Sequence, residues 1–465
     1  MRLQFAIALA AFALPASLQA QQLTPDETTA IDKAVTEALE RTGVPSAQIA
    51  VVRGGELVLD KAWGKASDKI PQSRSDLPYQ IASNSKQFLG ALLLLLEDEG
   101  KLSLDDKVAK WLPDVSGADR ITVRQLLSHT SGLQDFWPQD YSFAAMEKPV
   151  APADNVARRG MKPLDYEPGT RWQYSNTGYV VAGLIAEKAG GKPLWDQFRE
   201  RLFDPLGIKP LPIDETNGPA FPEGYHRNAL GPIRAAQPAA RGWLWAAGEL
   251  SMTAAELAEW DMARIERRLL PKEDWEEMER PVRLKDGTTN GYGLGVYNNM
   301  IGGRRTIFHG GESVGFLSQN TVWPDDKLAI VVLTNADFAG VQDELTTKLL
   351  NIVLPRAAQA ESAEAPRTDD VRKVLAALAE GKLDPALFTE NAQYYFKEPV
   401  LGDYKASLAK LGPATAVEPA RGARLRGGFV NRNFRLTFGD KKLVLITYAE
   451  PGEHGRWEQF IISPE

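Results

Sequence analysis

A hydroxyl and an amine precede the most apolar segment of the chain. Ser83 and Lys86 are three residues apart, and an apolar run from Ala91 to Leu96 follows them. Residues i and i+3 share one face of a helix, so a helix that begins near Ala82 or Ser83 would bring the two groups together. A helix N-terminus favours negative charge, and burial lowers the pKa of a lysine, which can then act as a base. The segment therefore predicts a buried central helix with a nucleophile at its start.

The Ser-x-x-Lys pattern fixes only two positions, and it recurs at Ser407 and Lys410. The alternative interpretation of Ser83 is a helix N-cap, with Lys86 reaching into solvent. Nucleophilic catalysis also needs groups that move protons, stabilise an oxyanion and orient the substrate. The rest of the chain must supply them if Ser83 is catalytic.

Two further segments carry suitable groups. Tyr174-Ser175-Asn176 lies on a loop between two expected helices, and His309-Gly310-Gly311 follows an expected strand. The two glycines would let a substrate backbone approach closely.

Composition excludes several classes of function. The chain has 465 residues and a formal net charge of -7, which argues against nucleic acid and anionic membrane surfaces as partners. It contains no cysteine, so no disulfide can form and the fold must depend on its hydrophobic core.

The first twenty residues have the pattern of a secretory signal peptide. Arg2 gives a positive start, Leu3 to Leu14 is apolar but too short to span a bilayer, and Ala20 suits cleavage. We therefore expect a periplasmic or secreted protein without a membrane span in the mature chain. An uncleaved N-terminal anchor is the alternative.

Periodicity divides the remainder into a large and a small domain. A hairpin is expected near residues 48–63, helices follow, and a second hairpin over 317–335 precedes a helix over 338–354. This order predicts one antiparallel sheet built from both ends of residues 21–355, with helices inserted between. Residues 356–369 are predicted to form a linker, and 370–465 a small α+β accessory domain.

The three polar segments, in this order and at these spacings, resemble the penicillin-recognising serine hydrolases. That family includes class C β-lactamases, DD-carboxypeptidases, D-aminopeptidases and β-lactamase-like esterases, and its motifs include Ser-x-x-Lys and Lys-Thr-Gly. The resemblance covers residues from about 23 to 354 and extends to the turn His129–Leu133, Ala247-Gly248 and Tyr292–Gly295. It implies an α+β fold in which helices flank an antiparallel sheet and a helical domain is inserted.

The resemblance also implies roles for individual residues. Ser83 would be acylated, Lys86 would accept its proton or keep Tyr174 reactive, and Tyr174 would pass the proton to the leaving group and later activate water. Asn176 would hold Lys86 and the substrate. The oxyanion hole would consist of the N–H groups of Ser83 and Glu312. No metal or organic cofactor is implied.

The third segment departs from the family pattern. His309 replaces the lysine that helps to hold a substrate carboxylate, and a free histidine is mostly uncharged at neutral pH. Glu312 adds negative charge, although Arg304 and Arg305 lie nearby in sequence. These changes favour an ester, an amide or a short peptide with an N-terminal amine. His309 could instead be a structural, hydrogen-bonded histidine at a strand end.

Other interpretations remain open at this stage. A binding or sensor protein could keep the same residues and turn over slowly or not at all. Gly311–Gly315 matches the Gly-x-Ser-x-Gly nucleophile elbow, but a strand rather than a helix is expected after Ser313.

Three tryptophans on expected loops could line the cleft: Trp137, Trp243 and Trp245. Two histidines, His226 and His454, are interpreted as surface residues. The oligomeric state is left undetermined.

Overall fold

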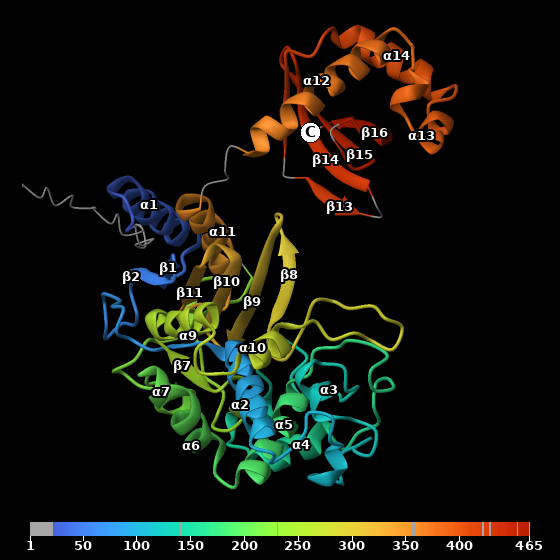
Figure 1. The fold of residues 1–465 in the computed structure, drawn as a ribbon. Helices are drawn as coiled ribbons and strands as arrows, with labels where there is room; N and C mark the ends of the chain where they lie inside the picture. The colour runs from blue at the N-terminus through green and yellow to red at the C-terminus, as the bar shows by residue number, and fades with distance from the viewer. Residues whose placement is uncertain are drawn as a thin grey trace, which may run out of the picture. The chain divides into compact units, whose positions relative to one another are not determined.

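A computed structural model describes residues 22–139, 142–229, 231–354, 359–420, 423–426, 429–452 and 454–464. The expected signal peptide, residues 1–20, lies outside this part of the chain. Two compact units make up the structure, and they divide between Val353 and Leu354. Figure 1 shows the order of their helices and strands.

The larger unit is built on a six-stranded sheet. Its strands follow the order β2 (Glu56–Gly64), β1 (Ser46–Arg53), β11 (Leu328–Thr334), β10 (Phe316–Trp323), β9 (Arg304–Ser313) and β8 (Tyr297–Ile301).

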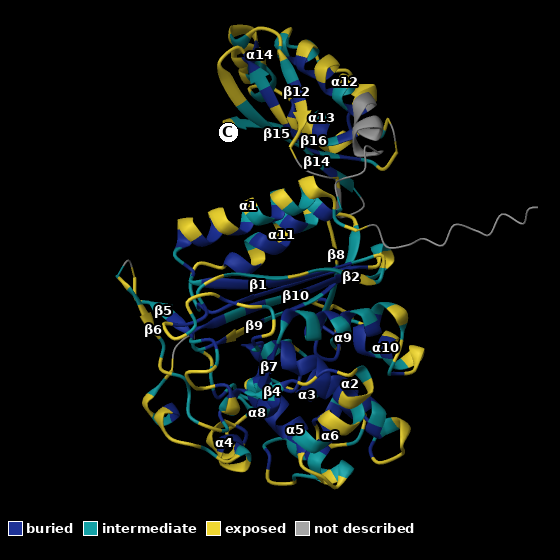
Figure 2. Cartoon of the chain, turned by 90° about the vertical axis from the view of Figure 1, so that its left-hand side faces the viewer, coloured by how far each residue is buried: buried dark blue, intermediate teal, exposed yellow. Residues whose placement is uncertain are grey.

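Antiparallel pairing of β1 with β11 joins the two ends of this unit, from Ala47 opposite Thr334 to Val52 opposite Ala329. Every residue of β11 is buried. Helices α1 (Pro25–Thr42) and α11 (Val341–Val353) cover one face of the sheet, and α9 (Ala254–Glu266) covers the other (Figure 2). The predicted α+β fold, with one sheet built from both ends, is therefore confirmed.

Helices inserted between the two parts of the sheet form the rest of this unit. The central one is α2 (Lys86–Asp98), whose leucines are almost all buried, as predicted. Around it lie short helices and small sheets: α3 (Val123–Leu127), α4 (Pro152–Arg159), α5 (Asn176–Gly190), α6 (Leu194–Phe198), α7 (Asp204–Leu206), α8 (Trp245–Gly248), α10 (Lys272–Glu279), the sheet of β3 (Tyr79–Gln80), β7 (Leu250–Met252) and β4 (Leu211–Pro212), and the hairpin of β5 (Tyr225–Arg227) and β6 (Ile233–Ala235).

The start of α2 differs from the prediction. The α-helix begins at Lys86, and a 3₁₀ turn, η1 (Ala82–Ser85), precedes it. Side chains at i and i+3 eclipse each other in a 3₁₀ turn, so Ser83 and Lys86 still lie on the same side. Ala82 has a positive φ of 46°, an uncommon conformation for alanine that bends the chain immediately before Ser83.

Two glycines allow the segment 293–295 to pack against α2. A Cβ atom at Gly90 would lie 2.5 Å from the Leu294 carbonyl oxygen, and one at Gly295 would lie 2.8 Å from the Lys86 carbonyl oxygen. Gly295 also has a φ of 92°, which other residues rarely adopt. This close approach fixes the backbone around Lys86 and explains Gly295 of the Tyr292–Gly295 stretch.

The smaller unit packs three helices against an antiparallel sheet. The helices are α12 (Gln359–Ala379), α13 (Glu390–Tyr395) and α14 (Val400–Leu411), and the strands are β12 (Ala416–Pro419), β13 (Arg424–Arg426), β14 (Phe429–Phe438), β15 (Lys441–Ala449) and β16 (Trp457–Pro464). Its own core includes Leu378, Phe434 and Phe460, each fully buried. The Arg367 guanidinium carbon lies 3.7 Å from the centre of the Trp457 ring.

The predicted linker over 356–369 is mostly helical, because α12 begins at Gln359, while residues 355–358 lie outside the described part. Alanine and glutamate, which we interpreted as linker composition, are also strong helix formers. Within the described residues, no helix has both the length and the apolar character needed to cross a bilayer.

Candidate active site

The structure brings the first two polar segments into direct contact. The Ser83 hydroxyl oxygen lies 2.9 Å from the Lys86 Nζ atom and 2.8 Å from the Tyr174 hydroxyl oxygen. The N-cap interpretation of Ser83 is wrong, because Ile81 precedes η1 and Ser85 precedes α2 at the N-cap positions, and the Ser83 hydroxyl contacts the Lys86 and Tyr174 side chains instead. The nucleophile candidate therefore contacts two groups that can exchange a proton with it.

The other hydrogen bonds of the Lys86 amine determine whether it directs a proton or its lone pair towards the Ser83 hydroxyl. Its Nζ atom lies 2.9 Å from Asn176 Oδ1 and 2.6 Å from the Ala247 carbonyl oxygen. Both oxygens can only accept, so Lys86 donates one hydrogen bond to each of them. A neutral amine would then direct its lone pair towards the Ser83 hydroxyl.

Asp135 fixes the orientation of Asn176. Its carboxylate accepts hydrogen bonds from the Asn176 backbone N–H at 3.1 Å and from Asn176 Nδ2 at 3.2 Å. With Nδ2 held there, Oδ1 must face Lys86. Sequence reasoning missed this role, and the only signal was the position of Asp135 two residues after the turn His129–Leu133.

Burial gives Lys86 an unusual protonation state. Its side chain is fully buried, and this burial lowers the pKa of Lys86 to about 7, while the negative charge of Asp135 opposes the shift. An ordinary lysine has a pKa of about 10.4. About half of the Lys86 side chains are therefore neutral at pH 7 and able to accept a proton.

Tyr174 is a phenol rather than a phenolate. Burial raises the pKa of Tyr174 well above its ordinary value, and this effect outweighs the opposing hydrogen bond to Ser83. The Lys86 Nζ atom lies 4.8 Å from the centre of the Tyr174 ring. The Tyr174 hydroxyl therefore donates its proton to Ser83 in the resting site.

His129 packs against this tyrosine, with ring centres 4.1 Å apart. Its Nδ1 atom accepts a hydrogen bond from the Ser175 backbone N–H at 3.1 Å, and burial lowers the pKa of His129 well below its ordinary value. His129 is thus a neutral, structural residue that holds the Tyr174 loop.

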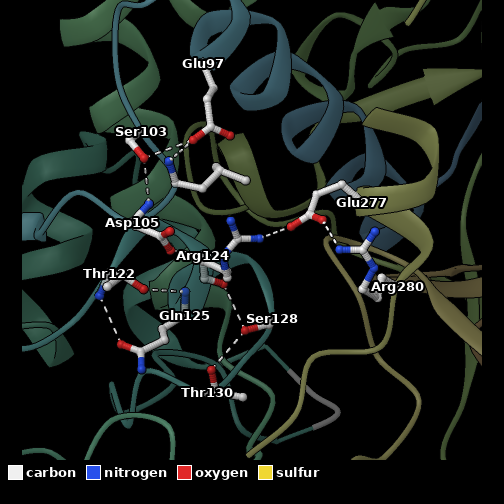
Figure 3. Close-up of polar contacts among 11 residues, drawn as sticks. Glu97, Ser103, Asp105, Thr122, Arg124, Gln125, Ser128, Thr130, Glu277 and Arg280 are labelled. Atoms are coloured by element: carbon white, nitrogen blue, oxygen red, sulfur yellow. Dashed lines mark hydrogen bonds and ion pairs between the residues drawn. The ribbon is translucent and has the colours of Figure 1, made fainter. Parts of the chain in front are cut away.

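A polar network supports the turn that carries His129 (Figure 3). The Ser128 hydroxyl donates to the Arg124 carbonyl oxygen and contacts the Thr130 hydroxyl, each at 2.9 Å. The Arg124 side chain forms ion pairs with Asp105 and with Glu277 of α10. These contacts tie the turn to two neighbouring elements and so position the ring that packs on Tyr174.

The third segment faces the same cleft but carries no positive charge. His309 Nε2 lies 2.9 Å from the Tyr292 hydroxyl, and Nδ1 lies 2.5 Å from the Gly310 carbonyl oxygen. The carbonyl can only accept, so Nδ1 carries the proton and Nε2 accepts from Tyr292. Burial, followed by the charge of Lys86, lowers the pKa of His309 to about 3. His309 therefore combines the hydrogen-bonded structural role with a position on the cleft wall.

Gly311 allows β9 to approach the catalytic turn. A Cβ atom at this position would lie 2.0 Å from the Ile81 carbonyl oxygen, which is closer than any side chain could approach. The Ser318 hydroxyl of β10 donates to the same carbonyl at 2.8 Å. Gly310 and Glu312 also line the cleft, and Glu312 is exposed.

The cleft has a volume of about 1130 Å³, and Ser83, Tyr174, Asn176 and His309 all border it. Of the three tryptophans considered as cleft residues, Trp137 lines the cleft, Trp243 is buried in the core and Trp245 lines a different cavity. Both His226 and His454 were interpreted as surface residues. His226 lines the cleft, and His454 is exposed.

The two competing serine motifs lack such surroundings. Ser313 lies on β9 and donates to Gln80 Oε1 at 2.8 Å, and strand β10 follows after a short turn, so the elbow geometry is absent. Ser407 and Lys410 are exposed on α14. In the described residues, no group of three or more histidine, aspartate and glutamate side chains could hold a metal ion.

The chain belongs to the β-lactamase family, because the Beta-lactamase family model matches residues 31–353. It is 30% identical over 337 residues to a D-aminopeptidase of Brucella anthropi, and this match covers 70% of the chain but only 63% of that relative. The family match and such relatives support serine hydrolase activity.

Two solved structures are also similar. A D-stereospecific amidohydrolase from Streptomyces sp. is 28% identical, with a TM-score of 0.60 and coverage of 70% of this chain and 98% of that one. A penicillin-binding protein homologue from Pyrococcus abyssi is 20% identical, with a TM-score of 0.63 and coverage of 94% and 95%. At 20% identity, the similarity to the Pyrococcus abyssi protein supports the fold alone.

Proposed function

We propose that this chain is an exported serine hydrolase that forms an acyl-enzyme on Ser83 and cleaves an amide or peptide bond of a D-amino acid with a free amine. The contacts of the Ser83 hydroxyl with Lys86 and Tyr174 carry the proposal, because they combine a nucleophile, a base and a proton donor. The D-aminopeptidase and the D-stereospecific amidohydrolase among its relatives support the substrate class.

Acylation begins with the neutral form of Lys86. Its lone pair takes the proton of the Ser83 hydroxyl as the oxygen attacks the substrate carbonyl carbon. The backbone N–H groups of Ser83 and Glu312 would stabilise the oxyanion, and loss of one such donor typically costs about 10²–10³ in rate. Tyr174 then gives its proton to the leaving amine and regains one from Lys86, so the C–N bond breaks with protons balanced.

Deacylation uses the same groups in reverse. Water attacks the ester carbonyl, Tyr174 and Lys86 relay its proton back to the Ser83 oxygen, and the free acid leaves. The raised pKa of Tyr174 means that it acts as a relay and that Lys86 is the base. In this proposal Lys86 therefore accepts the Ser83 proton directly.

Charges around the cleft favour a substrate with an amine. Glu312 is exposed in the cleft, and Asp337 and Asp343 line it as well. His309 is uncharged in place of the lysine that holds a carboxylate in relatives with Lys-Thr-Gly. Arg227 is the one arginine among the described lining residues, so acidic side chains outnumber it and the cleft favours a protonated amine over a carboxylate.

Hydrolysis of D-phenylalanine amide, followed as ammonia release, tests the proposal. We expect the wild type to prefer the D-enantiomer and the free amine over the N-acetylated amide, and Ser83→Ala to be inactive. Glu312→Gln should raise KM for the free amine and leave the N-acetylated substrate unaffected. Equal rates for both enantiomers would contradict the substrate class, and turnover by Ser83→Ala would contradict the mechanism.

Export is part of the same proposal, and N-terminal sequencing of protein from a periplasmic fraction tests it. The expected mature chain begins after Ala20. A chain that keeps its first twenty residues in the membrane fraction would support the anchor instead.

A further inference from the structure

A second cavity borders the catalytic turn. It has a volume of about 1310 Å³ and is distinct from the catalytic cleft, although η1 contributes to both: Ser83 lines the cleft and Ser85 lines the second cavity. Helices α6 and α8 (Figure 2) supply part of its wall. The mechanism proposed above uses none of its side chains.

One part of this cavity is apolar and aromatic. Trp195 and Phe198 of α6, Trp245 of α8 and Val150 line it. Aromatic walls with a few polar groups are typical of sites that bind small molecules.

The polar part holds two carboxyl groups side by side. Ile213 N–H donates to the Glu249 carbonyl oxygen at 2.8 Å, next to the pairing of β4 with β7, and this places Asp214 beside Glu249. The buried Glu249 Oε2 atom receives no hydrogen bond from an N–H or hydroxyl group in the described part of the chain, but the Glu249 and Asp214 carboxyl groups are hydrogen-bonded to each other when one of them carries a proton. Burial, followed by the negative charge of Asp214, raises the pKa of Glu249 to about 8.

Other charges around the cavity do not balance this pair. Glu147 and Glu215 also line it, and Arg241 is the single basic residue among the described lining residues. Arg241 Nε lies 3.5 Å from Asp214 Oδ2, and its side chain is 82% exposed, so the attraction is strongly screened. The cavity thus combines an apolar wall with excess negative charge and a buried carboxyl group whose hydrogen-bond partner is a second carboxyl group.

We propose that this cavity is a second binding site for an amphipathic primary amine, distinct from the catalytic cleft. The ammonium group would donate to the carboxylates of Asp214 and Glu249, and the apolar part would lie against Trp195, Phe198 and Trp245. Binding would release the proton that Glu249 carries at neutral pH, because the cation favours the ionised carboxylate.

Calorimetric titration with phenethylamine and with the neutral phenethyl alcohol tests this site. The wild type should bind the amine at least tenfold more tightly than the alcohol and release a proton on binding. Since the pKa of Glu249 is about 8, affinity should rise about tenfold from pH 7 to pH 9, where a primary alkyl amine remains mostly charged.

Three variants test whether Glu249 and Asp214 are the residues that bind the amine. Glu249→Gln should abolish the preference for the amine. Asp214→Asn should weaken binding and move its pH dependence to lower pH, because the charge that raises the pKa of Glu249 is lost. Asp286→Asn, which alters an exposed aspartate that lines neither cavity, is the matched control and should bind as the wild type does.

Equal affinity for amine and alcohol would overturn the proposal, as would an unchanged preference in folded Glu249→Gln protein. Loss of amine binding in Glu312→Gln but not in Glu249→Gln would assign the amine to the catalytic cleft and would also overturn it. Hydrolytic activity enters none of these readouts, so failure of this site is distinguishable from failure of the proposed function.

Discussion

The pH dependence of Ser83 reactivity follows from the burial of Lys86. With a pKa of about 7 for this side chain, half of the enzyme has a neutral base at pH 7, but only about 1% does at pH 5. The rate of acylation should therefore fall about fifty-fold from pH 7 to pH 5 and rise about twofold from pH 7 to pH 9. Intact mass after timed exposure to a fluorophosphonate measures this rate at each pH.

His309, His129 and Tyr174 also face Lys86, and none of them accounts for this acidic limb of the pH–rate profile. Burial raises the pKa of Asp135, so its contribution is tested by a variant of its own. Burial lowers the pKa of His309 to about 3 and that of His129 well below its ordinary value, and it raises the pKa of Tyr174 above 10. Asp135→Asn should move the limb to lower pH, because the carboxylate charge raises the pKa of Lys86.

Glu249→Gln is the matched control, because burial and Asp214 raise the pKa of Glu249 to about 8 in the neighbouring cavity, and this variant should leave the limb in place. A rate independent of pH between 5 and 8 would refute the assignment of Lys86 as the base. A limb that disappears in Glu249→Gln would refute it as well.

Three substitutions test other contacts. Tyr174→Phe removes the hydroxyl 2.8 Å from Ser83, and we expect turnover on the order of 10²–10⁴ lower, with an unchanged melting temperature. Gly311→Ala places a methyl group 2.0 Å from the Ile81 carbonyl oxygen, so it should cost about 1–3 kcal/mol in urea unfolding and slow labelling of Ser83. Glu279→Gln weakens a buried carboxylate that accepts from three arginines, and it should lower the free energy of unfolding by about 3–5 kcal/mol.

Local patterns were sufficient to predict the sheet and the order of the polar segments. Short apolar runs rich in β-branched residues in two hairpins indicated strands, and pairing of β1 with β11 confirmed that both ends of the larger unit meet. The Ser83 and Lys86 side chains lie on one side of the chain, although through a 3₁₀ turn instead of the first turn of an α-helix.

Interactions between distant segments explain what the sequence could not reveal. A single aspartate forms no recognisable sequence motif. The role of Asp135 in orienting Asn176 was therefore identified only from the hydrogen bonds between the two residues. In the smaller unit, Asn431 and Asn433 favour a turn by residue preference, but both belong to the continuous strand β14, where Asn431 Nδ2 donates to the Thr447 carbonyl oxygen at 2.8 Å. Pairing with β15 outweighs the turn preference of asparagine.

Labelling of the mature protein with a fluorophosphonate, for wild type and Ser83→Ala, tests the proposed nucleophile most directly. We expect one adduct on the wild type, located at Ser83 by peptide mapping, and none on Ser83→Ala. An adduct that survives in folded Ser83→Ala would contradict the assignment of the nucleophile. Folded wild type that forms no adduct would instead favour the binding or sensor protein.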